Sequence, residues 1–85
     1  MTSRYVLFHD PWCPFCRRVT NFLESQQYSL PMRDVAQDRD ALKELVKGGG
    51  RGTVPCLKIF RDDETVQWLY ESMDIIEFLR TELAS

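Results

Sequence analysis

The segment that most constrains the fold of this chain is Trp12-Cys13-Pro14-Phe15-Cys16, which follows shortly after the apolar run 5–8. Apolar residues then recur at the spacing of one helical face, at Phe15, Val19, Phe22 and Leu23. These patterns predict a strand at Tyr5–His9 followed by a helix from about Pro14 to about Gln26. Two thiols held two residues apart at such a junction can open and close one small disulfide. The segment is therefore expected to be a reactive dithiol.

The two cysteines are expected to have different roles. Pro14 suits the first helical position, because its missing N–H is not needed there, and this leaves Cys13 at the N-cap. Unpaired backbone N–H groups and the positive end of the helix dipole favour a thiolate at Cys13, which we predict to be the nucleophile. Cys16 lies one turn later on the side that packs against the sheet. It is predicted to be the less exposed partner that attacks a mixed disulfide at Cys13.

Cysteines at this spacing have two other common roles, in a zinc site and in a structural pair. A zinc site needs two further ligands, and the chain offers only Cys56 and His9, whose positions repeat no metal-binding spacing. We therefore expect no metal. A structural disulfide or two inert buried thiols is the second alternative, although an odd count of three cysteines argues against a disulfide-stapled secreted scaffold.

Length and charge limit the remaining possibilities. We expect 85 residues, 44% of them hydrophobic, to form a single domain over residues 1–85. A net charge of −2 with scattered lysines and arginines predicts no nucleic-acid partner. No apolar stretch approaches 18 residues and residues 1–4 contain no signal-peptide core, so we expect no membrane association and a cytoplasmic location.

The rest of the chain alternates predicted strands and helices. A second strand is expected from Tyr28 to about Val35, with Pro31 moving it toward the edge of the sheet. A short helix follows, capped by Asp38 and stopped by Gly48-Gly49-Gly50, and its apolar residues are Ala41, Leu42, Leu45 and Val46.

The C-terminal half is expected to form a hairpin and a final helix. Strands at Cys56–Phe60 and Thr65–Tyr70 flank the polar loop 61–64. The last helix is predicted to have Ser72 as its N-cap and a buried stripe of Ile75, Ile76, Leu79 and Leu83. The resulting order is β-α-β-α-β-β-α. It predicts an α/β fold with a four-stranded mixed sheet and helices on both faces.

Two further segments stand out. A proline at the start of a central strand, in Thr53-Val54-Pro55, cannot donate to the strand ladder. From spacing alone a trans proline that opens the strand is favoured, whereas a cis Val54–Pro55 bond would expose Val54 backbone groups to an extended peptide. Glu71-Ser72 begins the last helix, where a Ser cap either binds a carboxylate or satisfies its own helix.

Together these segments resemble the glutaredoxin family within the thioredoxin fold. The resemblance rests on Cys13-Pro14-Phe15-Cys16, Thr53-Val54-Pro55 and Glu71-Ser72-Met73-Asp74-Ile75, and it covers essentially the whole chain. The last segment is especially similar to glutathione-transferase-like glutaredoxins and to the N-terminal domain of glutathione transferases.

The resemblance implies a role for each matching residue. Cys13 would take glutathione from a mixed disulfide, and Cys16 would resolve protein disulfides. Pro55 would be the cis-proline, and the Val54 backbone would pair with the cysteinyl part of glutathione. The γ-glutamyl end would be bound by the side chains that begin the last helix, namely Glu71, Ser72 and Asp74. Phe15 replaces the commoner Tyr of the family and keeps its ring.

One departure from the family concerns positive charge. Many glutaredoxins have a lysine shortly before the first cysteine, whereas this chain has His9-Asp10-Pro11-Trp12. The candidates for a substitute cation are Arg17 and Arg51, each of which could equally be a solvated surface arginine.

The resemblance implies a glutathione-dependent thiol–disulfide oxidoreductase with no bound cofactor, in which glutathione is the co-substrate. Its partners would be glutathionylated or disulfide-containing proteins, and we expect a monomer. One alternative is an iron–sulfur carrier in which Cys13 of two chains and two glutathiones hold a cluster, although Pro14 disfavours it. The other is a binding module derived from a glutathione transferase N-terminal domain.

Overall fold

The computed structural model describes residues 4–84. Residues 1–3, on which the expectation of no signal peptide partly rests, and residue 85 lie outside the described residues. The elements follow the predicted order and are β1 (Tyr5–His9), α1 (Pro14–Ser25), β2 (Met32–Asp34), α2 (Arg39–Gly49), β3 (Cys56–Phe60), β4 (Val66–Tyr70) and α3 (Ser72–Ala84).

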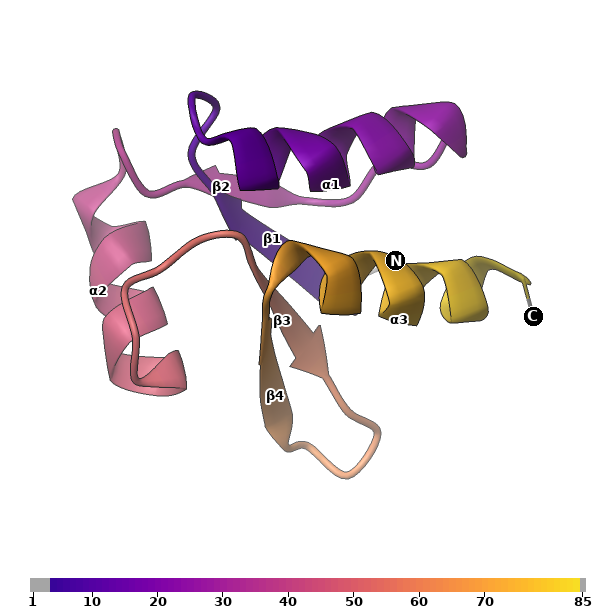
Figure 1. Ribbon diagram of the computed structural model, residues 1–85. Helices are drawn as coiled ribbons and strands as arrows, with labels where there is room; N and C mark the ends of the chain where they lie inside the picture. The colour runs from indigo at the N-terminus through magenta and orange to yellow at the C-terminus, as the bar shows by residue number, and fades with distance from the viewer. Residues whose placement is uncertain (1–3, 85) are drawn as a thin grey trace.

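The strands form one mixed sheet in the order β2-β1-β3-β4. β1 pairs in parallel with β2 and antiparallel with β3, and β3 pairs antiparallel with β4. The parallel pair needs a crossover, which α1 supplies, whereas β3 and β4 need only a short hairpin loop. Figure 1 shows α1 and α3 on one face of the sheet and α2 on the other. The predicted four-stranded mixed sheet with helices on both faces is confirmed.

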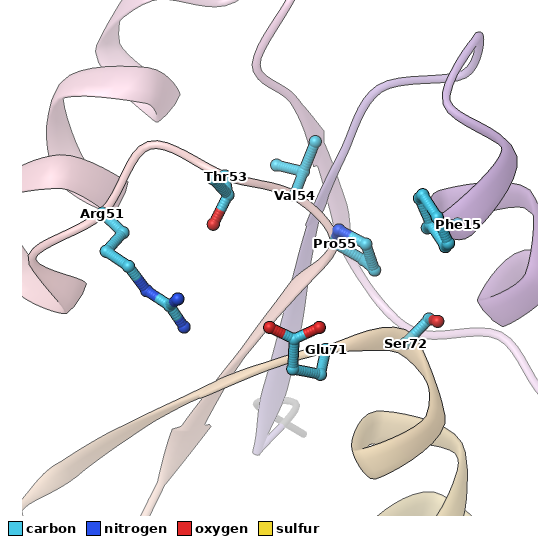
Figure 2. Close-up of a pocket in the computed structure, with 7 residues that line it drawn as sticks. All are labelled: Phe15, Arg51, Thr53, Val54, Pro55, Glu71 and Ser72. Atoms are coloured by element: carbon cyan, nitrogen blue, oxygen red, sulfur yellow. The ribbon is translucent and has the colours of Figure 1, made fainter.

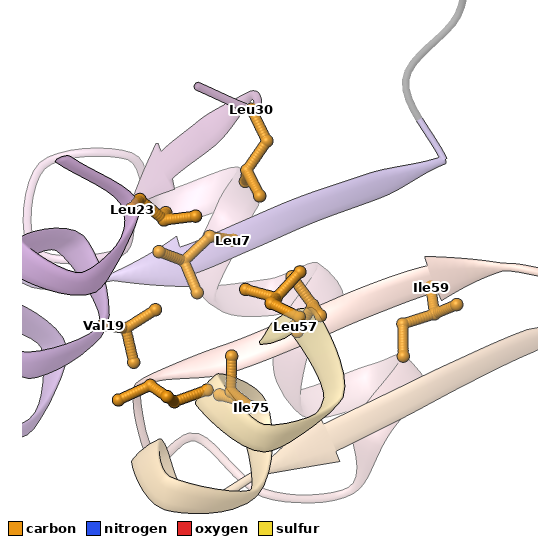
Figure 3. Packing of buried hydrophobic residues seen from close by; sticks show 9 residues of the cluster. Leu7, Val19, Leu23, Leu30, Leu57, Ile59 and Ile75 are labelled. Atoms are coloured by element: carbon orange, nitrogen blue, oxygen red, sulfur yellow. The ribbon is translucent and has the colours of Figure 1, made fainter. Parts of the chain in front are cut away.

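The face under α1 and α3 is closed by aliphatic side chains. Leu7 and Leu57 are register partners on β1 and β3, and both point toward these helices. The buried cluster around them, drawn in Figure 3, consists of Leu7, Val19, Leu23, Leu30, Leu57, Ile59, Ile75, Ile76 and Leu79. Each such side chain contributes about 1.5–3 kcal/mol on leaving water, so this cluster supplies much of the driving force for folding.

The opposite face, under α2, has a smaller buried cluster. Phe8 and Cys56 are the neighbouring register partners, and alternation along the strands directs them toward Ala41 and Leu45 of α2. Half-buried rings of Trp68 and other residues surround this cluster. An ionic network lies beside it, because the Glu44 carboxylate accepts hydrogen bonds from both Arg33 and Lys58 at 2.6 Å.

The second strand is shorter than the predicted Tyr28–Val35, because Tyr28 takes part in the end of α1 and does not start β2. Gln27 has φ +53°, the Gln27 N–H donates to the Glu24 carbonyl at 3.0 Å, and the Tyr28 N–H donates to the Leu23 carbonyl at 3.0 Å. This pair of bonds is a Schellman motif. β2 therefore begins only at Met32, after Pro31, although its predicted place at the edge of the sheet is confirmed.

The stop of α2 is at Gly50 and not at the first glycine of the run. Asp38 caps the helix as predicted, since its carboxylate accepts from the Ala41 N–H at 3.1 Å. Gly48 and Gly49 continue the helix, and Gly50 ends it with φ +91°. Of the apolar residues expected to mark this helix, Ala41 and Leu45 are buried, whereas Leu42 and Val46 are exposed.

The remaining corrections are small. β4 begins at Val66 and not at Thr65. α3 begins at Ser72, and the Ile75 N–H donates to the Glu71 carbonyl at 3.0 Å, so Glu71 and not Ser72 occupies the N-cap position. Leu83 is only half-buried, whereas the rest of the predicted stripe is buried.

Candidate functional site

The dithiol lies at the predicted junction of β1 and α1. Cys13 occupies the N-cap position with an extended backbone and is partly exposed, and Pro14 is the first helical residue. The Cys13 N–H donates to the Asp10 carbonyl at 3.0 Å, which closes the loop between strand and helix. Cys13 is therefore the thiol that a substrate can reach.

Cys16 has a different environment. Its side chain is fully buried, and its Sγ accepts a hydrogen bond from the Asp10 N–H at 3.4 Å. Burial raises the pKa of the Cys16 thiol to about 12, and a hydrogen bond with the Cys13 side chain acts in the same direction, whereas the Asp10 N–H lowers it. At neutral pH Cys16 is consequently protonated. This asymmetry suits a nucleophile at Cys13 and a resolving thiol at Cys16.

A cavity of ≈ 250 Å³ opens beside Phe15, which lies within the Cys13–Cys16 segment, although neither cysteine lines it. It is lined by residues from three separate segments of the chain, which Figure 2 shows around one hollow: Phe15, Arg51, Thr53, Val54, Pro55, Glu71 and Ser72. Phe15 belongs to the apolar stripe of α1 by spacing, yet it is 56% exposed and forms one side of the cavity. The cavity carries a guanidinium on one side and a carboxylate on another, so it offers groups for both ends of a zwitterionic ligand.

Arg51 is held in place by Tyr70 of β4, whose side chain packs on the α2 face of the sheet. The Tyr70 hydroxyl donates to the Arg51 carbonyl at 2.8 Å, and the Arg51 guanidinium lies 4.3 Å from the centre of the Tyr70 ring. Burial raises the pKa of Tyr70, so its hydroxyl remains a donor at neutral pH. Within residues 4–84 no acidic side chain pairs with Arg51, which leaves its guanidinium available to a ligand.

Glu71 and Ser72 form the third side of the cavity. Glu71 adopts φ +73° at the N-cap position of α3, and its carboxylate faces the hollow in Figure 2. Ser72 follows at the first helical residue and is 5% exposed. The free N–H groups of the first helical turn lie here, and they favour an anionic group of a ligand.

The cavity gathers most of the residues that the sequence suggested for ligand binding, with two differences. Asp74 is exposed on α3 and does not line the cavity, whereas Thr53, which the sequence singled out only as part of a motif, does. The Val54–Pro55 peptide bond is cis, in agreement with the family resemblance and against the trans form that spacing alone favoured. Cys56 is fully buried behind it, and burial raises the pKa of its thiol to about 12.

Residues 4–84 provide neither a metal-binding cluster nor a membrane-spanning helix. No cluster of three or more His, Cys, Asp or Glu side chains there could hold a metal ion. Among the same residues, no helix has the length and apolarity needed to cross a membrane.

Comparison with known proteins places this geometry in context. The family model described as Glutaredoxin matches residues 5–66, and no curated protein sequence matches the chain. The solved holo form of glutaredoxin C1 from Populus tremula x tremuloides is 24% identical, with 96% of this chain and 80% of that chain covered and a TM-score of 0.68. The thioredoxin-like protein BC3987 is 23% identical, with 88% and 97% covered and a TM-score of 0.66. At this identity both support the fold alone.

A third similar structure belongs to a larger protein. The Leishmania trimeric glutathione transferase TDR1 is 27% identical over 92% of this chain, with a TM-score of 0.72. The match covers only 17% of the transferase chain, so it concerns one part of that protein.

Proposed function

This chain belongs to the glutaredoxin family, with its thioredoxin-like fold and thiol-oxidoreductase type of site, and we propose that it reduces glutathione mixed disulfides and protein disulfides with glutathione as the electron donor. Cys13 is the proposed nucleophile and Cys16 the proposed resolving thiol. The glutathione-binding residues in this proposal are Phe15, Arg51, Thr53, Val54, Pro55, Glu71 and Ser72.

The observation that carries the proposal is the cavity beside Phe15, two residues after the partly exposed Cys13. A γ-glutamyl tripeptide has an ammonium and a carboxylate at one end and a second carboxylate at the other. The cavity has Glu71 and the start of α3 on one side and the unpaired Arg51 on another. Charge-assisted hydrogen bonds to both ends would hold the ligand with its central cysteine toward the dithiol.

The proposed reaction exchanges one disulfide for another without a metal or bound organic cofactor. The Cys13 thiolate attacks the glutathionyl sulfur of a mixed disulfide, the Cys13–glutathione disulfide forms, and the substrate leaves as a thiolate that takes up a proton. A second glutathione, as thiolate, then attacks that disulfide, which releases glutathione disulfide and restores the Cys13 thiolate. With protein disulfides, Cys13 forms a disulfide to one protein sulfur and releases the other as a thiolate. Cys16, after losing its proton, attacks the Cys13 sulfur, which releases the second protein thiolate and leaves a Cys13–Cys16 disulfide. Two glutathiones in succession then reduce this disulfide, and glutathione disulfide is released.

Cys16 is expected to be needed for only one of these substrates. Its raised pKa keeps it protonated, so it competes poorly with an incoming glutathione at a small mixed disulfide. We further propose that the chain acts as a monomer in the cytoplasm, where the glutathione pool supplies the electrons.

The test is the glutathione-dependent reduction of a small glutathione mixed disulfide, coupled to glutathione reductase. Wild type, Cys13→Ser and Cys16→Ser are compared under the same conditions. We expect Cys13→Ser to abolish turnover and Cys16→Ser to retain it, while reduction of a protein disulfide is lost in both. An inactive wild type, or equal activity in Cys13→Ser and wild type, would contradict the proposal.

A second variant separates binding from chemistry. Glu71→Gln keeps the shape of the side chain and removes its charge, and we expect it to raise the KM for glutathione with little change in kcat. Glu82→Gln, on the last turn of α3 and outside the cavity lining, is the matched control and is expected to behave like wild type.

A further inference from the structure

A basic face lies on α1 beside the dithiol and outside the proposed glutathione cavity. It is formed by Pro14, Arg17, Arg18 and Asn21, which line a shallow hollow of ≈ 320 Å³. None of these residues lines the first cavity. Spacings of three, four and seven residues from Pro14 place them on one side of the helix. The basic face and the cavity therefore flank Cys13 separately.

The two arginines of the basic face are not explained by the fold. Both are exposed, and within residues 4–84 neither forms an ion pair, although Arg18 lies 5.7 Å from the centre of the Phe15 ring. α1 has no acidic residue in its first turn, and its one carboxylate, Glu24, follows Arg17 by two turns. Cations near the N-terminal end of a helix oppose its dipole.

This positive charge is local, because the chain as a whole carries a net charge of −2. Trp12, directly before Cys13, is 88% exposed and places an apolar ring near the same end of α1. An exposed aromatic ring next to unpaired arginines is typical of the energetically important part of a protein-binding surface. Two arginines on one short helix suit a few carboxylates better than the extended charge of a nucleic-acid backbone.

We propose that the basic face binds acidic side chains next to the disulfide of a protein substrate, so that glutathionylated proteins with Asp or Glu near the modified cysteine are preferred. This rests on the proposed function. The glutathionyl half occupies the cavity, and the protein half lies across Trp12 and the basic face. Cys13 attacks the glutathionyl sulfur, the bond to the protein sulfur breaks, and the protein leaves as a thiolate that is then protonated. Arg17 and Arg18 are positioning residues for the leaving protein.

The experiment uses two peptides that differ only in charge. Each contains one glutathionylated cysteine, flanked on both sides by Asp in one peptide and by Lys in the other. The rate of peptide thiol release in the first turnover is measured with the reduced wild type at low and at high salt. We expect the acidic peptide to react roughly tenfold faster at low salt, as weak exposed ion pairs in combination allow, and the preference to shrink at high salt.

Charge reversal tests the location. Arg17→Glu/Arg18→Glu is expected to abolish or invert the ratio of the two rates. The matched control is Arg4→Glu/Arg61→Glu, which changes the net charge equally at the end of the sheet where Arg4 meets the hairpin loop. This control is expected to keep the ratio. If the first double variant does not fold, Arg17→Gln/Arg18→Gln replaces it, with the ratio expected to fall to about one.

The outcomes separate the two proposals. Because both peptides carry the same glutathionyl group, any effect of the arginines on glutathione itself cancels in the ratio. Equal rates for the two peptides in wild type at low salt, or a ratio that charge reversal leaves unchanged, would overturn the acidic-substrate proposal while leaving the glutaredoxin activity intact. Failure to release either peptide would overturn the proposed function itself.

Discussion

The buried cluster under α1 and α3 is wholly aliphatic, whereas the buried cluster under α2 is smaller, consists of Phe8, Ala41, Leu45 and Cys56, and has an ionic network beside it. On the first face the buried cluster reaches from Leu7 on β1 to Leu79 on α3. On the second, the Phe8 ring lies between Trp68, at 5.5 Å between centroids, and the Arg33 guanidinium, at 5.6 Å.

The cavity is lined by residues whose positions depend on both faces of the sheet. Phe15 and Ser72 come from the helices of the aliphatic face. Arg51 is held by Tyr70, which packs against the cluster under α2, and Val54 also packs there. We therefore expect stability and ligand geometry to depend on different faces of the sheet. Changes to the aliphatic face should mainly affect folding, and changes under α2 should mainly affect the position of Arg51.

The largest losses of unfolding free energy are expected from one Leu→Ala substitution in each of the two buried clusters. Leu79 and Leu45 are both fully buried, one on each face. We expect Leu79→Ala to cost about 3–5 kcal/mol and Leu45→Ala about 2–3 kcal/mol, because Leu45 belongs to the smaller cluster and its removal leaves fewer buried neighbours without contacts. Urea unfolding with matched m-values measures both. A larger loss for Leu45→Ala would contradict the distinction between the faces.

A smaller effect is expected where α2 touches β4. A Cβ on Gly49 would lie 2.1 Å from the Tyr70 hydroxyl oxygen and 3.0 Å from its ring carbon Cζ. Alanine is the better helix former by up to about 1 kcal/mol, yet we expect Gly49→Ala to destabilise the protein by about 1–3 kcal/mol because the ring must move. The same movement should raise the KM for glutathione, since Tyr70 holds Arg51.

Removal of the hydroxyl provides the control for this contact. In a Tyr70→Phe background the closest contact is lost, so Gly49→Ala should cost clearly less than in wild type. Tyr70→Phe alone should cost about 0.5–1.5 kcal/mol through the lost hydrogen bond to Arg51. If Gly49→Ala were stabilising in the wild-type background, the close approach of α2 and β4 would not constrain the site.

Most strand bounds and helix caps could be predicted from the sequence because they depend on residues that are neighbours in the chain. The bounds of β1 and β3, Cys13 at an N-cap and Asp38 as a cap all follow from neighbouring residues. The predicted end of α1 at about Gln26 agrees with its last residue Ser25 and its cap Gln26. The second strand was predicted to start too early because the left-handed residue of the Schellman motif is Gln27, where glycine is the usual signal. Conversely, Gly48 and Gly49 suggested a helix stop but serve a close approach to rings of β4.

The candidate site was predictable to the extent that its residues belong to recognisable motifs. Phe15, Val54, Pro55, Glu71 and Ser72 do so, and they line one cavity. The orientation of Arg51 depends on Tyr70, which is 19 residues away in the sequence, and no local pattern predicts that contact. Asp74 belongs to the same motif as Glu71 and Ser72 but does not line the cavity.

The smallest expected effect concerns the ionic network under α2. The hydrogen bond from Lys58 lowers the pKa of the Glu44 carboxyl, and Arg33 adds to this effect, while burial opposes it. A carboxyl whose pKa is lowered by folding stabilises the protein above its unfolded value, about 4.3, and loses that contribution as the pH falls through its folded value. Glu44→Gln should therefore reduce the free energy of unfolding at pH 7 by about 1 kcal/mol or less, since the pair is partly exposed.

The pH dependence distinguishes this charge effect from a loss of packing. We expect the stability difference between wild type and Glu44→Gln to be largest near neutral pH and to vanish at acidic pH, where Glu44 in wild type is also uncharged. Urea unfolding from pH 7 to pH 3 measures it. The aliphatic face contains no titratable side chain in its buried cluster, so the difference between Leu79→Ala and wild type should change far less over the same range. A Glu44→Gln difference independent of pH would mean that α2 is held by packing alone, as α1 and α3 are.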